Sequence, residues 1–184
     1  RLCLAVMEPL EHRQIYDENW SEFSVQYVSQ IAEETNENDL TNKAMRALYD
    51  LSRNGNDGCS ATALQAYFRV ARKLKWKMQE EDTDQIEKVI NGRDFSRRMK
   101  VAALSALQYA ETCDNEALIQ AIRQIVKSTG HPLRRFAKAA LGNVGEKKED
   151  LVLLSNAIES GNILVSNAAI NGLARLEQKL NSKN

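Results

Sequence analysis

A short pattern of small and apolar residues recurs along the C-terminal half of this 184-residue chain. It runs apolar, basic, two spacers, Ala, two spacers, Ala, Leu. The copies occupy residues 133–142, 99–107 and, more loosely, 165–173, and their closing leucines lie 34 and 32 residues apart (Leu107, Leu141 and Leu173). Repeats of this period predict antiparallel helix pairs that stack on one another, because one pair cannot bury its apolar face alone.

Helical periodicity extends along nearly the whole chain, and strand-like alternation is almost absent. Clusters of polar turn residues divide it into nine segments. Their connections are a few residues long, which makes neighbouring helices antiparallel. We expect a single domain over 1–184, in which 1–17 are irregular. The predicted helices are 18–34, 38–53, 59–78, 82–90, 95–111, 114–128, 131–144, 147–159 and 162–180.

The pattern resembles the HEAT-repeat family, on the residues of 133–142, 99–107 and loosely 165–173. Small residues three apart let a neighbouring helix approach closely, and the adjoining leucine fills the gap between layers. The resemblance implies an all-α, right-handed α-solenoid of about four to five stacked antiparallel helical hairpins, related to armadillo-like folds. The family's usual acidic residue, three positions before each copy, is replaced by Ser96, Gly130 and Asn162.

Bulk composition restricts the class of protein. Hydrophobic residues make up 43% of the chain and the net charge is zero, which is typical of a soluble globular protein without a strong attraction to anionic surfaces. Three widely spaced cysteines favour a reducing compartment, so we expect a cytoplasmic protein. No apolar run is long enough to span a membrane. Because the chain begins with Arg1, we expect a processed or excised piece of a longer protein.

The sign of the charge alternates from helix to helix. Segment 58–80 carries +4, 81–92 carries −3 and 93–110 carries +3, and the alternation continues to the C-terminus. Alternate helices of a solenoid form opposite faces, so the helices that carry the repeat are expected to form one basic face. We expect it to bind a partner through Arg69, Arg72, Lys73, Trp76, Arg97, Arg135 and Lys138.

The predicted helix 59–78 contributes most to this expectation. Its apolar residues fall on one side at 100° per residue, whereas Arg69, Arg72, Lys73 and Trp76 fall opposite. An aromatic residue within a basic stripe is typical of peptide-binding hot spots and of surfaces on which nucleic-acid bases stack. The alternative interpretation is that Trp76 packs against a neighbouring hairpin, because solenoid helices have more than one buried flank.

The residues of known catalytic and metal sites do not occur at useful spacings. His12 and His131 have no acidic or thiol partner nearby in sequence, and no cysteine pair has zinc-ligand spacing. We therefore expect no enzyme activity, no cofactor and no bound metal. Nothing in the sequence indicates an oligomeric state.

The leading hypothesis is a protein-binding scaffold module whose basic face receives an acidic or amphipathic protein segment. Two alternatives remain open. The same face could bind a nucleic-acid backbone, as in some HEAT-like proteins, including alkylpurine DNA glycosylases. The chain could also be a regulatory subunit or domain of an enzyme, as in the HEAT-like bilin lyases.

Overall fold

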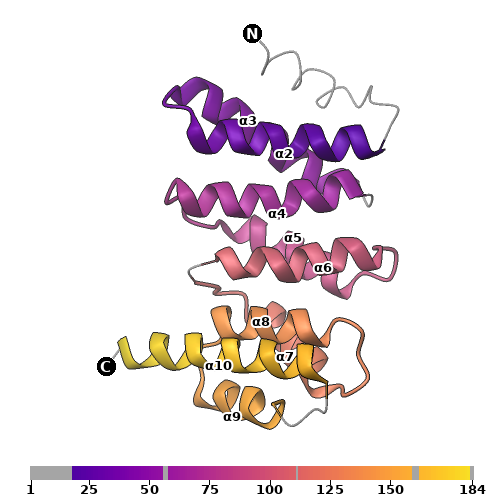
Figure 1. Ribbon diagram of the computed structural model, residues 1–184, viewed down its shortest axis with the longest axis vertical. Helices are drawn as coiled ribbons and strands as arrows, with labels where there is room; N and C mark the ends of the chain where they lie inside the picture. The colour runs from indigo at the N-terminus through magenta and orange to yellow at the C-terminus, as the bar shows by residue number, and fades with distance from the viewer. Residues whose placement is uncertain (1–17, 56–57, 111, 159–161, 183–184) are drawn as a thin grey trace. The chain divides into compact units, whose positions relative to one another are not determined.

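The computed structural model describes residues 18–55, 58–110, 112–158 and 162–182, with backbone alone for 18–21. These residues form nine α-helices and one 3₁₀ turn, and they contain no strand, as the all-α prediction requires (Figure 1). No helix among them has the length and apolar composition needed to cross a bilayer. The elements are α2 (Glu18–Glu34), α3 (Asn38–Arg53), α4 (Gly58–Lys73), α5 (Glu80–Asn91), α6 (Arg97–Ala106), η1 (Leu107–Tyr109), α7 (Glu116–Lys127), α8 (Arg134–Val144), α9 (Lys148–Asn156) and α10 (Ile163–Ser182).

The predicted helices correspond to the observed ones in order. The bounds of α2 and α3 are those predicted, and most other bounds differ by a few residues. The prediction for 59–78 is wrong at its C-terminal end, because α4 ends at Lys73. The segment 1–17, expected to be irregular, lies outside the described residues. The chain forms two compact units, and the single domain stays a prediction.

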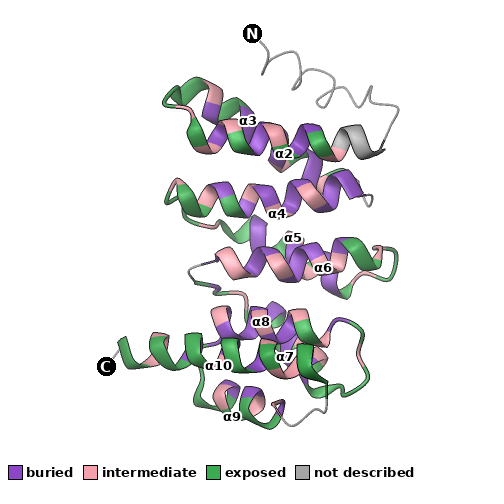
Figure 2. Ribbon diagram, viewed as in Figure 1, coloured by how far each residue is buried: buried purple, intermediate pink, exposed green. Residues whose placement is uncertain are grey.

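Unit 1 comprises Arg1–Lys77 and Asp94–Ala106, and contains α2, α3, α4 and α6. Helix α4 packs against all three others, and more than half of its residues are buried (Figure 2). Helices α2, α4 and α6 run in the same direction. Glu22 near the start of α2 pairs with Arg98 near the start of α6, and Glu33 near the end of α2 pairs with Arg69 in the second half of α4.

The first residue of α4 lies beneath the Glu22–Arg98 pair. A Cβ atom placed on Gly58 would lie 2.7 Å from the guanidinium carbon of Arg98. A residue larger than glycine here would require the ends of the Glu22 and Arg98 side chains, which join two helices across α4, to move.

Unit 2 comprises Met78–Arg93 and Leu107–Asn184, and contains α5, η1, α7, α8, α9 and α10. Helix α8 lies against α7, α9, α10 and η1, while α5 packs on α7. Its core is formed by fully buried leucine and isoleucine side chains contributed by α7, α8, α9 and α10. Among them are Leu118, Ile122, Leu141, Leu154 and Leu176.

Two glycines set the distance between α8 and α10. A Cβ on Gly142 of α8 would lie 2.6 Å from the carbonyl carbon of Gly172 in α10, and a Cβ on Gly172 would lie 2.8 Å from the carbonyl oxygen of Lys138. Both glycines belong to copies of the repeated pattern. The repeat's small residues therefore allow backbone to pack directly on backbone here.

A buried ion pair joins α7 to the start of α9. The guanidinium of Arg123 donates to both carboxylate oxygens of Asp150, at 2.7 and 2.9 Å. Asp150 also accepts from the backbone N–H groups of Glu146 and Lys147. Burial alone would raise the pKa of Asp150, but these hydrogen bonds hold it below its ordinary value.

Candidate interaction surface

The end of α4 carries a group of exposed cationic side chains around an exposed aromatic one. We call Arg72, Lys73, Lys75, Trp76 and Lys77 the α4 terminal patch, since all five are exposed. Trp76 keeps 44% of its surface in contact with solvent. A large indole left this far exposed beside cations has the composition of a protein-binding hot spot.

The backbone of the patch ends α4 with a defined hydrogen-bonded turn. The N–H of Trp76 donates to the carbonyl of Ala71 at 2.9 Å, and the N–H of Lys75 donates to that of Arg72 at 3.0 Å. This pair of bonds is the Schellman motif, which places the residue after the helix in the left-handed region. Lys75 lies there, with φ at 57°. Because the chain turns at Lys75, Trp76 extends from the turn and not from the predicted helical stripe.

Arg69 and Lys73 form ion pairs with Glu33 of α2. The Nε of Arg69 lies 2.7 Å from a carboxylate oxygen of Glu33, and the Nζ of Lys73 lies 3.8 Å from the other oxygen. Arg69 also donates to the hydroxyl of Ser29, which is fully buried. These two cations therefore connect α2 to α4, and their charge is partly balanced within unit 1.

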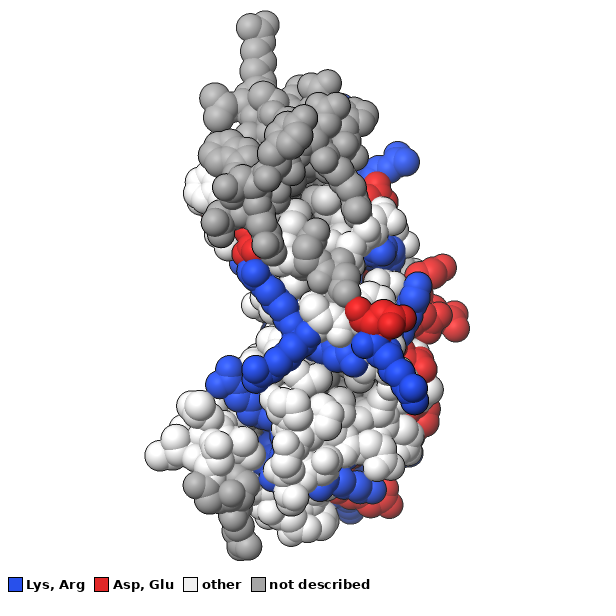
Figure 3. All heavy atoms as spheres, turned by 90° about the vertical axis from the view of Figure 1, so that its right-hand side faces the viewer, with Lys and Arg blue, Asp and Glu red and all other residues white. Residues whose placement is uncertain are grey.

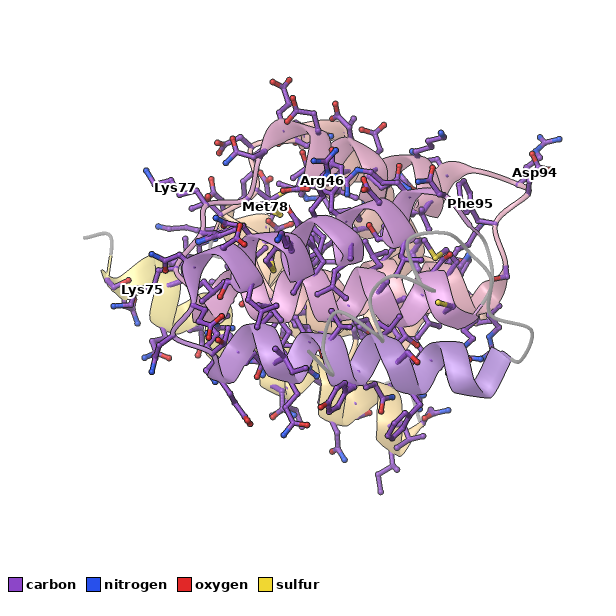
Figure 4. The ribbon with its side chains drawn as sticks, turned by 90° about the horizontal axis from the view of Figure 1, so that it is seen from above. Arg46, Lys75, Lys77, Met78, Asp94 and Phe95 are labelled. Atoms are coloured by element: carbon purple, nitrogen blue, oxygen red, sulfur yellow. The ribbon has the colours of Figure 1, made fainter. Side chains whose placement is uncertain are left out.

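Arg97 lies away from the α4 terminal patch. It is the first residue of α6, which begins at the end of unit 1 occupied by Asp94 and Phe95, whereas Lys75 and Lys77 lie at the opposite end (Figure 4). The side of the molecule on which Asp94 and Phe95 lie also carries Lys and Arg side chains, with Asp and Glu side chains among them (Figure 3). The structure thus brings Arg72, Lys73 and Trp76 together, but not Arg97 with them.

The two remaining predicted site residues belong to unit 2. Arg135 is exposed, with its guanidinium carbon 4.3 Å from the ring centre of Phe136. Lys138 contradicts the expectation of an exposed basic face, because none of its surface reaches solvent. Its ammonium donates to the carbonyl of Ala157 at 2.9 Å, at the end of α9. Burial, with a smaller contribution from Arg134, lowers its pKa to about 8.

Unit 2 also contains a pocket of about 540 Å³ near the starts of α5 and α7. Three of its lining residues are exposed carboxylates, and Cys113, one of its buried lining residues, is a free thiol. Burial raises the pKa of that thiol, so it stays protonated and is a poor nucleophile at neutral pH. The lining residues are Met78, Gln79, Glu80, Thr83, Asp84, Thr112, Cys113, Asp114 and Asn115.

Within the described ranges, no three metal-ligating side chains converge. The imidazole of His131 accepts a hydrogen bond from the N–H of Leu133 at 3.2 Å, just before α8 begins. His12 lies outside the described residues.

Comparison of the chain with protein-family models, with curated proteins and with solved structures found no match.

Proposed function

We propose that this chain is a non-catalytic protein-interaction module, a scaffold element that binds an acidic or amphipathic protein segment. The observation that carries the proposal is Trp76, which is 44% exposed among the cations of the α4 terminal patch. Burying a large exposed indole releases much apolar surface from water, and neighbouring Lys and Arg residues select a partner of negative charge. The binding residues of this proposal are Arg72, Lys73 and Trp76.

The architecture in this proposal is a right-handed, HEAT-like α-solenoid of about four to five hairpins. Two observations within the units support it. Helices α2, α4 and α6 run in one direction, as stacked equivalent helices of such repeats do. Helices α8 and α10 also run in one direction, since Lys138 and Asn143 of α8 contact Gly172 and Lys179 of α10 in the same order.

A reducing, cytoplasmic compartment is part of the same proposal. Cys113 is a free thiol and is buried. Buried unpaired thiols are typical of proteins that fold where disulfides do not persist.

The test is affinity capture from the native lysate with three forms of the tagged protein, each with and without nuclease. The site variant is Arg72→Glu/Lys73→Glu/Trp76→Ala. The matched control is Lys43→Glu/Arg46→Glu/Phe23→Ala, which also reverses two exposed charges and removes one exposed aromatic ring. The circular dichroism spectrum of each variant must match that of the wild type.

We expect a set of proteins that the wild type and the control retain after nuclease treatment and that the site variant loses. Equal retention by the site variant would contradict the proposal. Loss of the whole set on nuclease treatment would favour nucleic-acid binding. In that case affinity for a DNA duplex should fall steeply with salt, because each neutralised phosphate releases a counterion. A retained enzyme whose activity changes on binding would favour the regulatory role.

A further inference from the structure

A lysine occupies the one described non-glycine position with positive φ. Lys75 has φ at 57°, in the left-handed region where the Cβ of an L-residue crowds the following carbonyl. Helices that end in a Schellman motif usually place glycine there, because glycine has no Cβ. The turn at the end of α4 is therefore less stable with lysine than with glycine.

Among the described residues of unit 1, none forms a hydrogen bond or ion pair with the Lys75 side chain that would offset this cost. Lys75 is exposed, next to the half-exposed indole of Trp76, at the outer end of the unit (Figure 4). Non-glycine residues held in such backbone conformations cluster at active sites, ligand clamps and switch regions.

We infer that Lys75 is a specificity-determining residue of the α4 terminal patch, and that its partner is an acidic peptide segment. One carboxylate of the segment pairs with the Lys75 ammonium, and an adjoining apolar side chain packs on Trp76. This inference rests on the proposed function, whose binding residues did not include Lys75.

The charge around the patch favours an acidic peptide over a nucleic acid. Arg69 and Lys73 already bind one protein carboxylate, that of Glu33, beside the patch. Two cations are thereby partly neutralised, which leaves fewer of them for the many phosphate contacts of a nucleic-acid backbone, whereas a peptide can bind through one or two carboxylates. The net charge of zero likewise provides no long-range attraction for a polyanion.

The experiment begins with selection of a random displayed peptide library on the wild-type chain. The enriched peptide is then labelled with fluorescein, and its affinity is measured by fluorescence polarisation. The variants are Lys75→Gly, Lys75→Arg and Trp76→Ala, with Lys43→Gln on α3 as the matched loss of an exposed lysine. The midpoint of thermal unfolding is measured for each protein.

We expect enrichment of peptides rich in Asp and Glu with an aromatic or aliphatic residue. Lys75→Gly should raise the unfolding midpoint by about 2 °C, because the strain is relieved. It should also weaken binding about fivefold, because one ion pair is lost. Lys75→Arg and Lys43→Gln should bind like the wild type, and Trp76→Ala should weaken binding at least about tenfold. A more stable but poorer binder is a combination that a purely structural role of Lys75 would not produce.

Two results would overturn the inference while leaving the proposed function intact. One is enrichment of peptides that are not acidic, and the other is an unchanged affinity of Lys75→Gly for an acidic peptide. Failure to enrich any peptide would count against the inference and the proposed function together. Tighter binding of a labelled DNA duplex than of the peptide would overturn both in favour of nucleic-acid recognition.

Discussion

Replacement of Gly142 by Ala tests whether the α8–α10 contact depends on glycine. The added Cβ would lie 2.5 Å from the carbonyl oxygen of Gly172 and 2.6 Å from its carbonyl carbon. Non-bonded carbons settle at about 3.5 Å or more, so the two helices must separate by about 1 Å at this point. The obstructing atoms are backbone and cannot rotate away as the end of a side chain could.

The expected change in the free energy of unfolding is the balance of two opposing effects. Ala favours a helix over Gly by about 1 kcal/mol. Overpacking a close interface costs about 1–3 kcal/mol, and more where backbone must shift. Separating α8 from α10 also loosens buried Leu141 and Leu176. We therefore expect Gly142→Ala to lower the free energy of unfolding by about 2 kcal/mol, and the midpoint by about 4–8 °C for a chain of this size.

The assay is thermal and urea unfolding of the wild type, Gly142→Ala and the control Gly130→Ala. No heavy atom lies within 4 Å of a Cβ placed on Gly130, so this control should stay within about 0.5 kcal/mol of the wild type. If Gly142→Ala is as stable as Gly130→Ala, or gains the stability expected from helix propensity alone, the close approach of α8 and α10 is not required and the reasoning is wrong.

Two further predictions concern buried charges of unit 2. The folded state holds the pKa of Lys138 at about 8, below its ordinary 10.5, so between these values the unfolded chain binds more protons. The free energy of unfolding should therefore rise with pH over that window, by up to about 3 kcal/mol, and Lys138→Met should lack this rise in urea unfolding at pH 7 and pH 10. Equal pH dependence in both proteins would contradict the burial of an ionisable amine. Arg123→Ala leaves the carboxylate of Asp150 buried without its guanidinium partner and should destabilise by about 3–5 kcal/mol. Lys147→Ala should cost less than about 1 kcal/mol, because its ammonium lies 3.1 Å from Glu116, an exposed carboxylate that also pairs with Arg123. Equal urea midpoints for these two variants would refute the buried-pair argument.

Helix positions could be predicted from the sequence because turn residues and apolar periodicity mark them independently. The polar break after Glu34 separates α2 from α3, and both helices have the predicted bounds. The end of α4 could not be found in this way. Neither glycine nor proline marks Lys75, and the apolar positions Leu74 and Met78 continue the helical period beyond the true end. The turn is fixed by backbone hydrogen bonds that leave no signature in composition.

The candidate site was predicted in part. Arg72, Lys73 and Trp76 are all exposed, but Trp76 follows the turn at Lys75 and does not lie on the helical stripe whose spacing grouped it with the other two. Lys138 was assigned to an exposed face by its charge alone. The sequence contained evidence against this assignment. Lys138 lies four residues before Gly142, on the same side of α8, and a glycine on a helix face indicates close approach of another helix. Lys75 was missed because periodicity describes helix faces and does not describe the residue that follows a helix.

The chain crosses between its two units three times, and this order has a consequence for synthesis. Helix α5 belongs to unit 2, yet it precedes α6, which completes unit 1. A ribosome adding about 5–20 residues per second needs about 2–7 s to proceed from Asn91 to Lys127, the end of α7 on which α5 packs. During that interval the apolar side of α5, with Ile86, Val89 and Ile90, lacks its partner while unit 1 is being completed. Cleavage of the chain at one position cannot release either unit intact. A chain shortened to end before α7 would expose this apolar surface permanently.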